Sequence, residues 1–108
     1  MTKLTQKKCK PCEGGVDPLK KEDLSPYLEQ IENWEATDAK EIFKNFEFKN
    51  FKEALDFVNK AGEIAENEGH HPDIFLHSYK KVKISLSTHA IGGLSENDFI
   101  VAAKIDEI

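Results

Sequence analysis

The chain has 108 residues, of which 39% are hydrophobic and 32% are charged, enough for one domain with one modest core. Its formal net charge of −5 at pH 7 argues against nucleic-acid binding, which needs a basic face that displaces counterions. No apolar run approaches the roughly 20 residues of a membrane span, and the N-terminus lacks the apolar centre of a signal peptide. We therefore expect a cytoplasmic protein that makes no membrane contact.

Residues 1–18 form a polar arm and loop that contain both cysteines. Four lysines gather there without interleaved aromatic residues, which indicates a solvated tail (Lys3, Lys7, Lys8 and Lys10). The motif "CKPC" spans Cys9 to Cys12, a spacing found in half of a zinc site or in a redox pair, but no second CxxC exists. Two reduced thiols in a mobile or lightly packed arm are the favoured interpretation. The loop "PCEGGVDP" then separates this arm from a folded body over 19–108.

The first half of the body predicts a helix and then two strands. "KEDLSPYLEQIENW" carries Leu24, Leu28 and Ile31 at helical spacing. The start of the helix stays open, since Pro26 either sits early in the helix or marks its first turn, with Ser25 as the cap. "WEATDAKEIFKNFEF" is then typical of two short strands around a turn near Asp38.

The clearest helix begins after Asn50, an N-cap residue with Glu53 three positions later. Its predicted apolar stripe consists of Phe51, Ala54, Leu55, Val58, Ala61, Ile64 and Ala65. Gly69 is expected to end this helix in the left-handed conformation.

The rest of the chain predicts a hairpin and a closing helix. "IFLHSYKKVKISLSTHA" indicates two strands with a turn near Lys80 and Lys81. "GGLSENDFIVAAKI" indicates a helix capped by Ser95, with Asp98 at its third position; Leu94 and Phe99 form a plausible hydrophobic staple.

The predicted order is α-β-β-α-β-β-α, which belongs to the α+β class. The simplest single domain that buries every apolar stripe is a four-stranded antiparallel sheet with three helices packed on one face. The opposite face would expose lysines and serines, or pair with another subunit.

Histidines mark a candidate acid/base site. His70 and His71 lie just past the end of the long helix, and Pro72 restricts His71 to an extended backbone. His89 is expected to end the last strand on the same side of the domain, which would bring three imidazoles around one concave spot. Because the unperturbed pKa of histidine lies near neutrality, one imidazole can act as acid and another as base. A carboxylate in the last helical turn, Glu66 or Glu68, would be explained by a hydrogen bond that fixes an imidazole tautomer.

Two other interpretations of these histidines compete with an acid/base site. Histidines in loops and at strand ends occur by chance in many domains, and His77 inside a strand is expected to be an ordinary surface residue. A zinc site of three histidines is less favoured, because two adjacent residues make a poor chelate.

A longer pattern resembles the pterin-4a-carbinolamine dehydratase family. The matching positions are Glu66, His70-His71-Pro72, Tyr79, His89 and Asp98, with every gap in register. The resemblance extends over the strand-helix core from Ile42, the last strand, the closing helix and Trp34, and "CKPCEGG" is similar to an N-terminal extension of some members. Gly69 and Ile74 depart from the residues that many members carry there, which affects the rim of the pocket.

The resemblance implies a dehydratase that removes water from 4a-hydroxytetrahydropterin and so recycles the tetrahydropterin cofactor of aromatic amino acid hydroxylases. His70, His71 and His89 would be catalytic. Substrate-binding positions would be Glu66, Pro72, Thr88, Ala90, Ile91 and Asp98. No metal and no organic cofactor is implied, and the chain would assemble as a homodimer or homotetramer.

Two alternatives remain for the function. Some relatives on this fold act on a protein partner, as a dimerisation cofactor or an assembly factor, so a non-catalytic binding role is the main alternative; a hydroxylase or a regulatory factor would be such a partner. A small zinc protein that uses Cys9, Cys12 and two histidines is the other.

Overall fold

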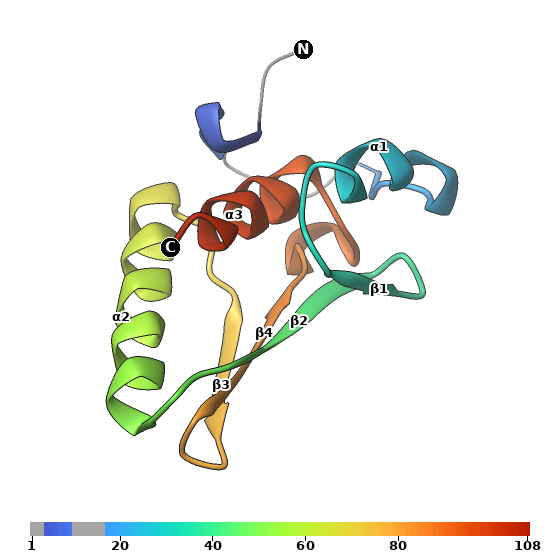
Figure 1. Cartoon of the computed structure of the whole chain (residues 1–108). Coiled ribbons are helices and arrows are strands. Elements are labelled where there is room, and N and C mark those ends of the chain that lie inside the picture. The colour runs from blue at the N-terminus through green and yellow to red at the C-terminus, as the bar shows by residue number, and fades with distance from the viewer. Residues whose placement is uncertain (1–3, 10–16) are drawn as a thin grey trace.

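The computed structural model describes residues 4–9 and 17–108, and Figure 1 shows their arrangement. The elements are α1 (Ser25–Leu28), β1 (Glu35–Thr37), β2 (Glu41–Glu47), α2 (Phe51–Glu68), β3 (Asp73–His77), β4 (Lys81–Leu86) and α3 (Glu96–Asp106), with 3-10 turns at Leu4–Gln6, Lys21–Asp23 and His89–Ile91. The predicted α+β class and the order α-β-β-α-β-β-α are therefore confirmed. No helix in the described ranges is long and apolar enough to cross a membrane.

The four strands form one antiparallel sheet in the order β1-β2-β4-β3. The central pair is β2 with β4, in a register that places Phe46 opposite Val82. The turn between β1 and β2 has positive φ at Asp38 and Ala39, and the turn between β3 and β4 has positive φ at Ser78 and Tyr79. Two consecutive left-handed residues give the turn a twist that matches the twist of the strands.

The core lies between the sheet and the helices α2 and α3, which cover one face of the sheet (Figure 1). The strands contribute Ile42, Val82, Ile84 and Leu86, all at most 1% exposed. The α2 stripe differs from the prediction: the buried residues are Ala54, Phe57, Ala61 and Ala65, whereas Phe51 and Leu55 are 48% and 42% exposed. Val58 and Ile64 pack partly against the core, so the predicted stripe was wrong for Phe51 and Leu55 and missed Phe57.

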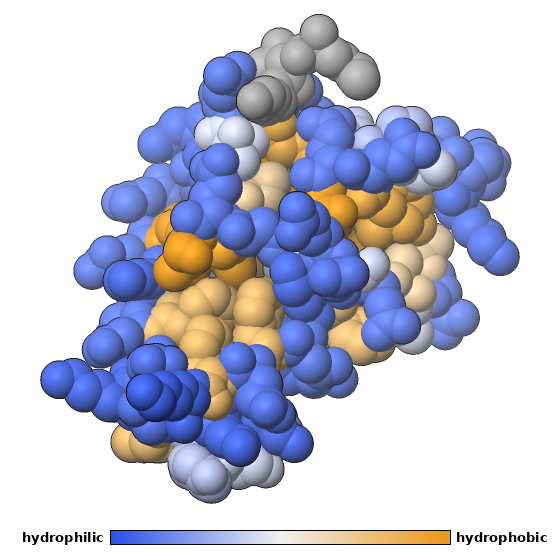
Figure 2. All heavy atoms as spheres, in the orientation of Figure 1, coloured by the Kyte–Doolittle hydropathy of each residue, from blue (hydrophilic) through white to orange (hydrophobic). Residues whose placement is uncertain are grey.

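Hydrophobic residues also reach the surface between α2 and β2, as Figure 2 shows on the face in view. A hollow lies there, and its lining includes Phe46, Phe48, Phe57 and Ile108. The ring centroids of Phe46 and Phe57 are 4.6 Å apart, and those of Phe48 and Phe57 are 4.9 Å apart. This aromatic cluster extends the core to the surface at the C-terminal end of α3.

The helix α3 is central in the fold, with apolar side chains buried on nearly all its sides. Such a helix needs cover on its outer side as well as on the side that faces the sheet. Part of that cover comes from residues 4–9, because Leu4 is only 2% exposed and belongs to the core. The prediction of a solvated tail was therefore wrong for these residues. Cys12 lies outside the described residues, and a boundary at residue 18 stays a prediction.

The first helix is shorter than the spacing of its apolar residues predicted. α1 ends at Leu28, and Ser25 is its first helical residue, not its cap, with Pro26 next. The backbone then bends, and Asn33 adopts a positive φ of 62°. Leu24 and Ile31 are nevertheless buried, Leu28 is partly buried, and the ring of Tyr27 stacks on Phe99 with centroids 5.0 Å apart. Tertiary contacts with α3 thus replace the helical turns that the sequence indicated.

Candidate active site

The end of α2 positions His70. Gly69 takes the left-handed conformation with φ 67°, as predicted, and its N–H donates to the Ala65 carbonyl oxygen. The His70 N–H donates to the same carbonyl at 3.3 Å, which closes the helix end. The turn directs the His70 ring toward the first turn of α3, where its Nε2 lies 2.6 Å from Asp98 Oδ1. The His70 side chain is only 12% exposed, so this imidazole is largely shielded from water.

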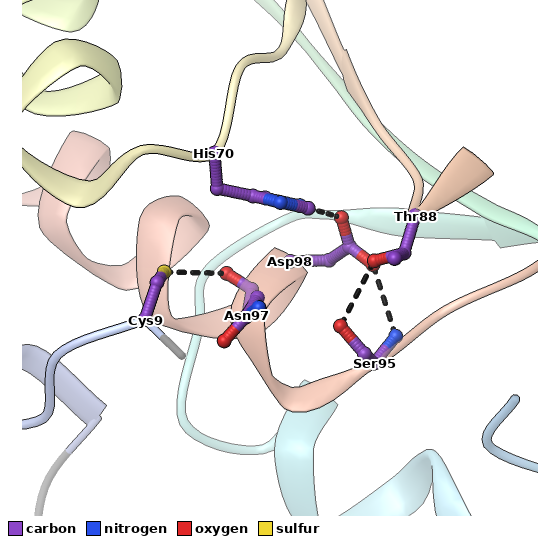
Figure 3. A network of polar contacts seen from close by, with 6 residues as sticks. All are labelled: Cys9, His70, Thr88, Ser95, Asn97 and Asp98. Atoms are coloured by element: carbon purple, nitrogen blue, oxygen red, sulfur yellow. Dashed lines mark hydrogen bonds and ion pairs between the residues drawn. The ribbon is translucent and has the colours of Figure 1, made fainter. Parts of the chain in front are cut away.

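Asp98 is the centre of a buried polar network (Figure 3). Its Oδ2 accepts from the Thr88 hydroxyl at 2.8 Å and from the Ser95 N–H at 3.0 Å, while its Oδ1 faces His70. Figure 3 shows His70 and Thr88 approaching the carboxylate from different sides. Asp98 occupies the third position of α3, where the helix N-terminus favours negative charge. The predicted capping role of Asp98 is confirmed, and the same side chain also contacts His70.

The network assigns the protons. A carboxylate carries no proton and can only accept hydrogen bonds. The hydrogen between His70 and Asp98 is therefore assigned to Nε2, which leaves Nδ1 as the acceptor nitrogen when the ring is neutral. The Thr88 hydroxyl donates its one hydrogen to Asp98. The 2.9 Å contact between Thr88 Oγ1 and Ser95 Oγ is therefore donated by Ser95. Every member has a partner, which fixes the orientation of the His70 ring.

His71 points elsewhere. Its Nε2 lies 2.8 Å from Glu66 Oε1, so the predicted contact of a carboxylate in this turn with an imidazole is present. The side chains of His71 and Glu66 are 60% and 79% exposed, and such a pair contributes little to stability. Both line an open groove of about 870 Å³ between α2 and β3, together with Pro72 and Ile74. The pair therefore shapes a surface, not the core.

His89 begins a 3-10 turn instead of ending a strand, because β4 stops at Leu86. Thr88 and Gly93 form an isolated bridge, with the Thr88 N–H donating to the Gly93 carbonyl at 2.7 Å. Gly92 closes the turn with φ 68°. This short loop presents His89, Ala90 and Ile91 at the surface, next to a small hollow lined by His89, Thr88 and Lys40 among others.

The three histidines are connected in part. His70 reaches Thr88 through Asp98, and Thr88 directly precedes His89. His71 and His89 line two different hollows of the described chain, so convergence of all three around one substrate stays a prediction. No group of three or more His, Cys, Asp or Glu residues among 4–9 and 17–108 could hold a metal ion. The zinc alternative needs Cys12, which is outside those ranges.

Several contacts at and near the candidate site differ from what the sequence indicated. Ser95 was expected only as a helix cap, yet it also donates to Thr88. Glu68 does not contact a histidine; its carboxylate accepts from Lys104 Nζ at 2.6 Å and from the Cys9 N–H at 2.8 Å. Tyr79, part of the family pattern, lies 61% exposed in the turn between β3 and β4. The capping pattern around Asp98 was the one local signal available for this network.

Comparison with known proteins identifies the class. Residues 17–108 match the family model described as pterin 4 alpha carbinolamine dehydratase. A relative from Rubrobacter xylanophilus is 47% identical over 100% of both chains, and one from Alkaliphilus metalliredigens is 49% identical over 99% of this chain and 96% of its own. Both carry the name pterin-4-alpha-carbinolamine dehydratase.

Two solved structures are similar. A Brucella melitensis protein described as a transcriptional coactivator/pterin dehydratase has a TM-score of 0.77 and 30% identity, covering 84% of this chain and 97% of that one. A pterin dehydratase-like RuBisCO assembly factor of the alpha-carboxysome has a TM-score of 0.55 over 68% of this chain and 83% of its own; at 23% identity it bears on the fold alone. Sequence and fold together define an enzyme of the hydro-lyase class. The chain belongs to the pterin-4a-carbinolamine dehydratase family.

Proposed function

We propose that this protein removes water from 4a-hydroxytetrahydropterin in the cytoplasm. The product would be the quinonoid dihydropterin, so that the tetrahydropterin cofactor of aromatic amino acid hydroxylases is recycled. Membership of the dehydratase family supports the reaction class. The observation that carries the mechanism is the buried contact of His70 with Asp98, since a carboxylate that fixes an imidazole tautomer prepares the other ring nitrogen for proton transfer.

The reaction requires two proton transfers. The 4a-hydroxyl leaves with the electron pair of its C–O bond and takes up one proton, which gives water. The proton on ring nitrogen N5 goes to a base, and the electrons of that N–H bond form the C4a=N5 double bond. These steps need an acid and a base near neutral pH, and the proposal therefore includes no metal and no organic cofactor.

The geometry supports His70 as the base: its Nε2 faces Asp98, and among residues 4–9 and 17–108 its Nδ1 has no hydrogen-bond partner, so that Nδ1 can accept a proton. His89 is exposed on its short loop and would donate to the leaving hydroxyl. His71, paired with Glu66, would act as a second acid or a positioning donor.

Substrate binding would involve the backbone of 88–91 and the groove at Pro72. Thr88 and Asp98 are 3% and 0% exposed, so their part in binding would be exerted through His70 and the loop.

The test compares histidine variants in the dehydration of freshly generated 4a-hydroxytetrahydropterin, followed by absorbance against the spontaneous rate. We expect His70→Ala and His89→Ala to lose about 100-fold or more of the catalysed rate. His77→Ala is the matched control, since His77 stacks on Phe75 with ring centroids 4.8 Å apart on β3. Folded His70→Ala with full activity would refute the assignment.

The proposal for the dehydratase also includes self-association, which is separate from the partner-binding alternative. Phe51 and Leu55 lie one turn apart on α2, and Phe75 on the edge strand β3 is 62% exposed. Large apolar side chains are typical of a surface that another chain covers where they gather in one patch. We propose a homodimer or homotetramer, with light scattering as the test. Wild type should have a multiple of the 12.3 kDa chain mass and Phe51→Lys or Phe75→Lys a lower one; a monomeric wild type would contradict this.

A further inference from the structure

The contact between His70 and Asp98 joins two separate elements, the end of α2 and the first turn of α3. His70 follows α2 by two residues, and Asp98 lies 28 residues further along the chain. A shift of either element would lengthen this 2.6 Å contact. Something must therefore hold the end of α2 against α3 with the precision that proton transfer requires.

Glu68, the last residue of α2, makes such a connection. Its side chain is only 7% exposed, and its two carboxylate oxygens have different partners: Lys104 of α3 and the backbone N–H of Cys9. Burial alone would raise the pKa of Glu68, but the hydrogen bonds from Lys104 and Cys9 outweigh it and lower the pKa below 4.5. Glu68 is thus ionised near neutral pH, and each of its two carboxylate oxygens accepts a hydrogen bond.

The N-terminal segment completes the connection. Cys9 Sγ lies 3.6 Å from the carbonyl oxygen of Asn97, the residue before Asp98, and Figure 3 shows these two residues beside the turn that carries Asp98. Lys7 forms an ion pair at 2.8 Å with Glu96, the first residue of α3. Residues 4–9 therefore run along α3, from Leu4 near Ala103 to the first turn at Glu96, and Cys9 then contacts Glu68.

We propose that Glu68 is a positioning residue for the proposed reaction: by holding Cys9 and Lys104 together, it fixes the end of α2, and with it the His70 ring, against Asp98. This inference rests on the function proposed above. Glu68 touches no substrate and acts through His70. It gives the N-terminal segment a part in catalysis, although that segment contributes no reacting group.

The experiment compares kcat and KM in the full chain. Glu68→Ala should lower kcat about 10-fold, because misplacing a reacting group by a fraction of an ångström slows the chemistry. KM should stay within about twofold, since the pocket itself is unchanged. Glu68→Gln keeps an acceptor for the Cys9 N–H and should recover part of the loss. Cys9→Ala keeps that N–H and loses only the weak contact of the thiol with Asn97, so its kcat should fall less than that of Glu68→Ala, whereas Cys9→Pro removes the N–H and should resemble Glu68→Ala.

Asp106→Asn is the matched control. Asp106 also belongs to α3 and also holds a largely buried lysine, Lys44, at 2.8 Å, but it lies at the opposite end of the helix from Asp98. This variant should lose stability without a specific loss of kcat. Equal loss of kcat in Asp106→Asn and Glu68→Ala at matched folded fraction would overturn the proposal.

A second readout does not depend on the reaction. The imidazole N–H of His70 that faces Asp98 should give a low-field proton resonance in the free protein, which broadens or moves in Glu68→Ala and stays in Asp106→Asn. If the wild type fails to accelerate dehydration, the proposed function fails while this resonance still decides the positioning role. An unchanged resonance in Glu68→Ala would refute it. Lys104→Met serves the same comparison if Glu68→Ala does not fold.

Discussion

Asp98→Asn separates the charge of the central carboxylate from its shape. The amide has nearly the same volume, so the buried site at 0% exposure should still pack. Its oxygen can accept from Thr88 and Ser95, as Oδ2 does now, which leaves the NH₂ group facing His70 Nε2. Because an amide nitrogen donates and does not accept, the imidazole must turn into the Nδ1–H tautomer.

The cost of this change can be worked from the three hydrogen bonds. Each bond to the charged carboxylate contributes about 1.5–3 kcal/mol, and a neutral one about 0.5–1.5 kcal/mol. Replacing three of the first kind, to His70, Thr88 and Ser95, by three of the second should lower the free energy of unfolding by about 4 kcal/mol. The proposed base loses its free acceptor at the same time, so kcat should fall by about 100-fold or more.

Two assays check this reasoning. Urea denaturation gives the free energy of unfolding, and nitrogen-15 spectra of the imidazole report which ring nitrogen of His70 carries the hydrogen. Wild type should show the Nε2–H form and Asp98→Asn the Nδ1–H form. A folded variant that keeps the Nε2–H tautomer, or that keeps full activity, would refute the assignment of protons.

Three further outcomes concern the N-terminal segment and its partner Glu68. Leu4→Ala should lower the free energy of unfolding by about 2 kcal/mol in urea titrations, because Leu4 is 2% exposed in the core; an unchanged midpoint would mean that this segment does not pack on α3. Burial and the nearby Glu68 raise the pKa of the Cys9 thiol to about 12, so in a Cys12→Ser variant Cys9 should resist alkylation at pH 8 until the protein unfolds; rapid labelling of folded protein would contradict this. Because the pKa of Glu68 is lowered in the folded protein, its ionised carboxylate stabilises the fold above pH 4.5, and this stabilisation is lost as the pH falls through the pKa of the folded state. Glu68→Gln should therefore make the free energy of unfolding depend less on pH in the acid range. The same pH dependence in the variant and the wild type would argue against the burial of this group.

Local signals account for the parts of the fold that were predicted. The Asn50 side chain accepts from the Glu53 N–H at 2.9 Å, and Gly69 ends the same helix, because capping chemistry involves only residues three or four positions apart. The length of α1 and the buried row of α2 depend on how closely α3 approaches, which no local pattern encodes. The N-terminal segment illustrates this most clearly, since the lysine-rich sequence around Leu4 gives no sign of the helix that it covers.

The site divides in the same way. The contact of Glu66 with His71 spans five residues and could be anticipated from their positions around the helix end. The partners of Glu68 are 36 and 59 residues away, so only the tertiary structure brings them together. The family resemblance pointed to Asp98 as a substrate-binding residue, while its burial beneath His70 follows from the packing of α3.

The most direct test of the central claim is the rate at which 4a-hydroxytetrahydropterin loses water with and without catalytic amounts of the purified protein, measured by stopped-flow absorbance at neutral pH. The account predicts a rate that rises in proportion to enzyme concentration and well above the spontaneous reaction. A folded protein that leaves the spontaneous rate unchanged would contradict the dehydratase mechanism and favour a partner-binding role for this chain.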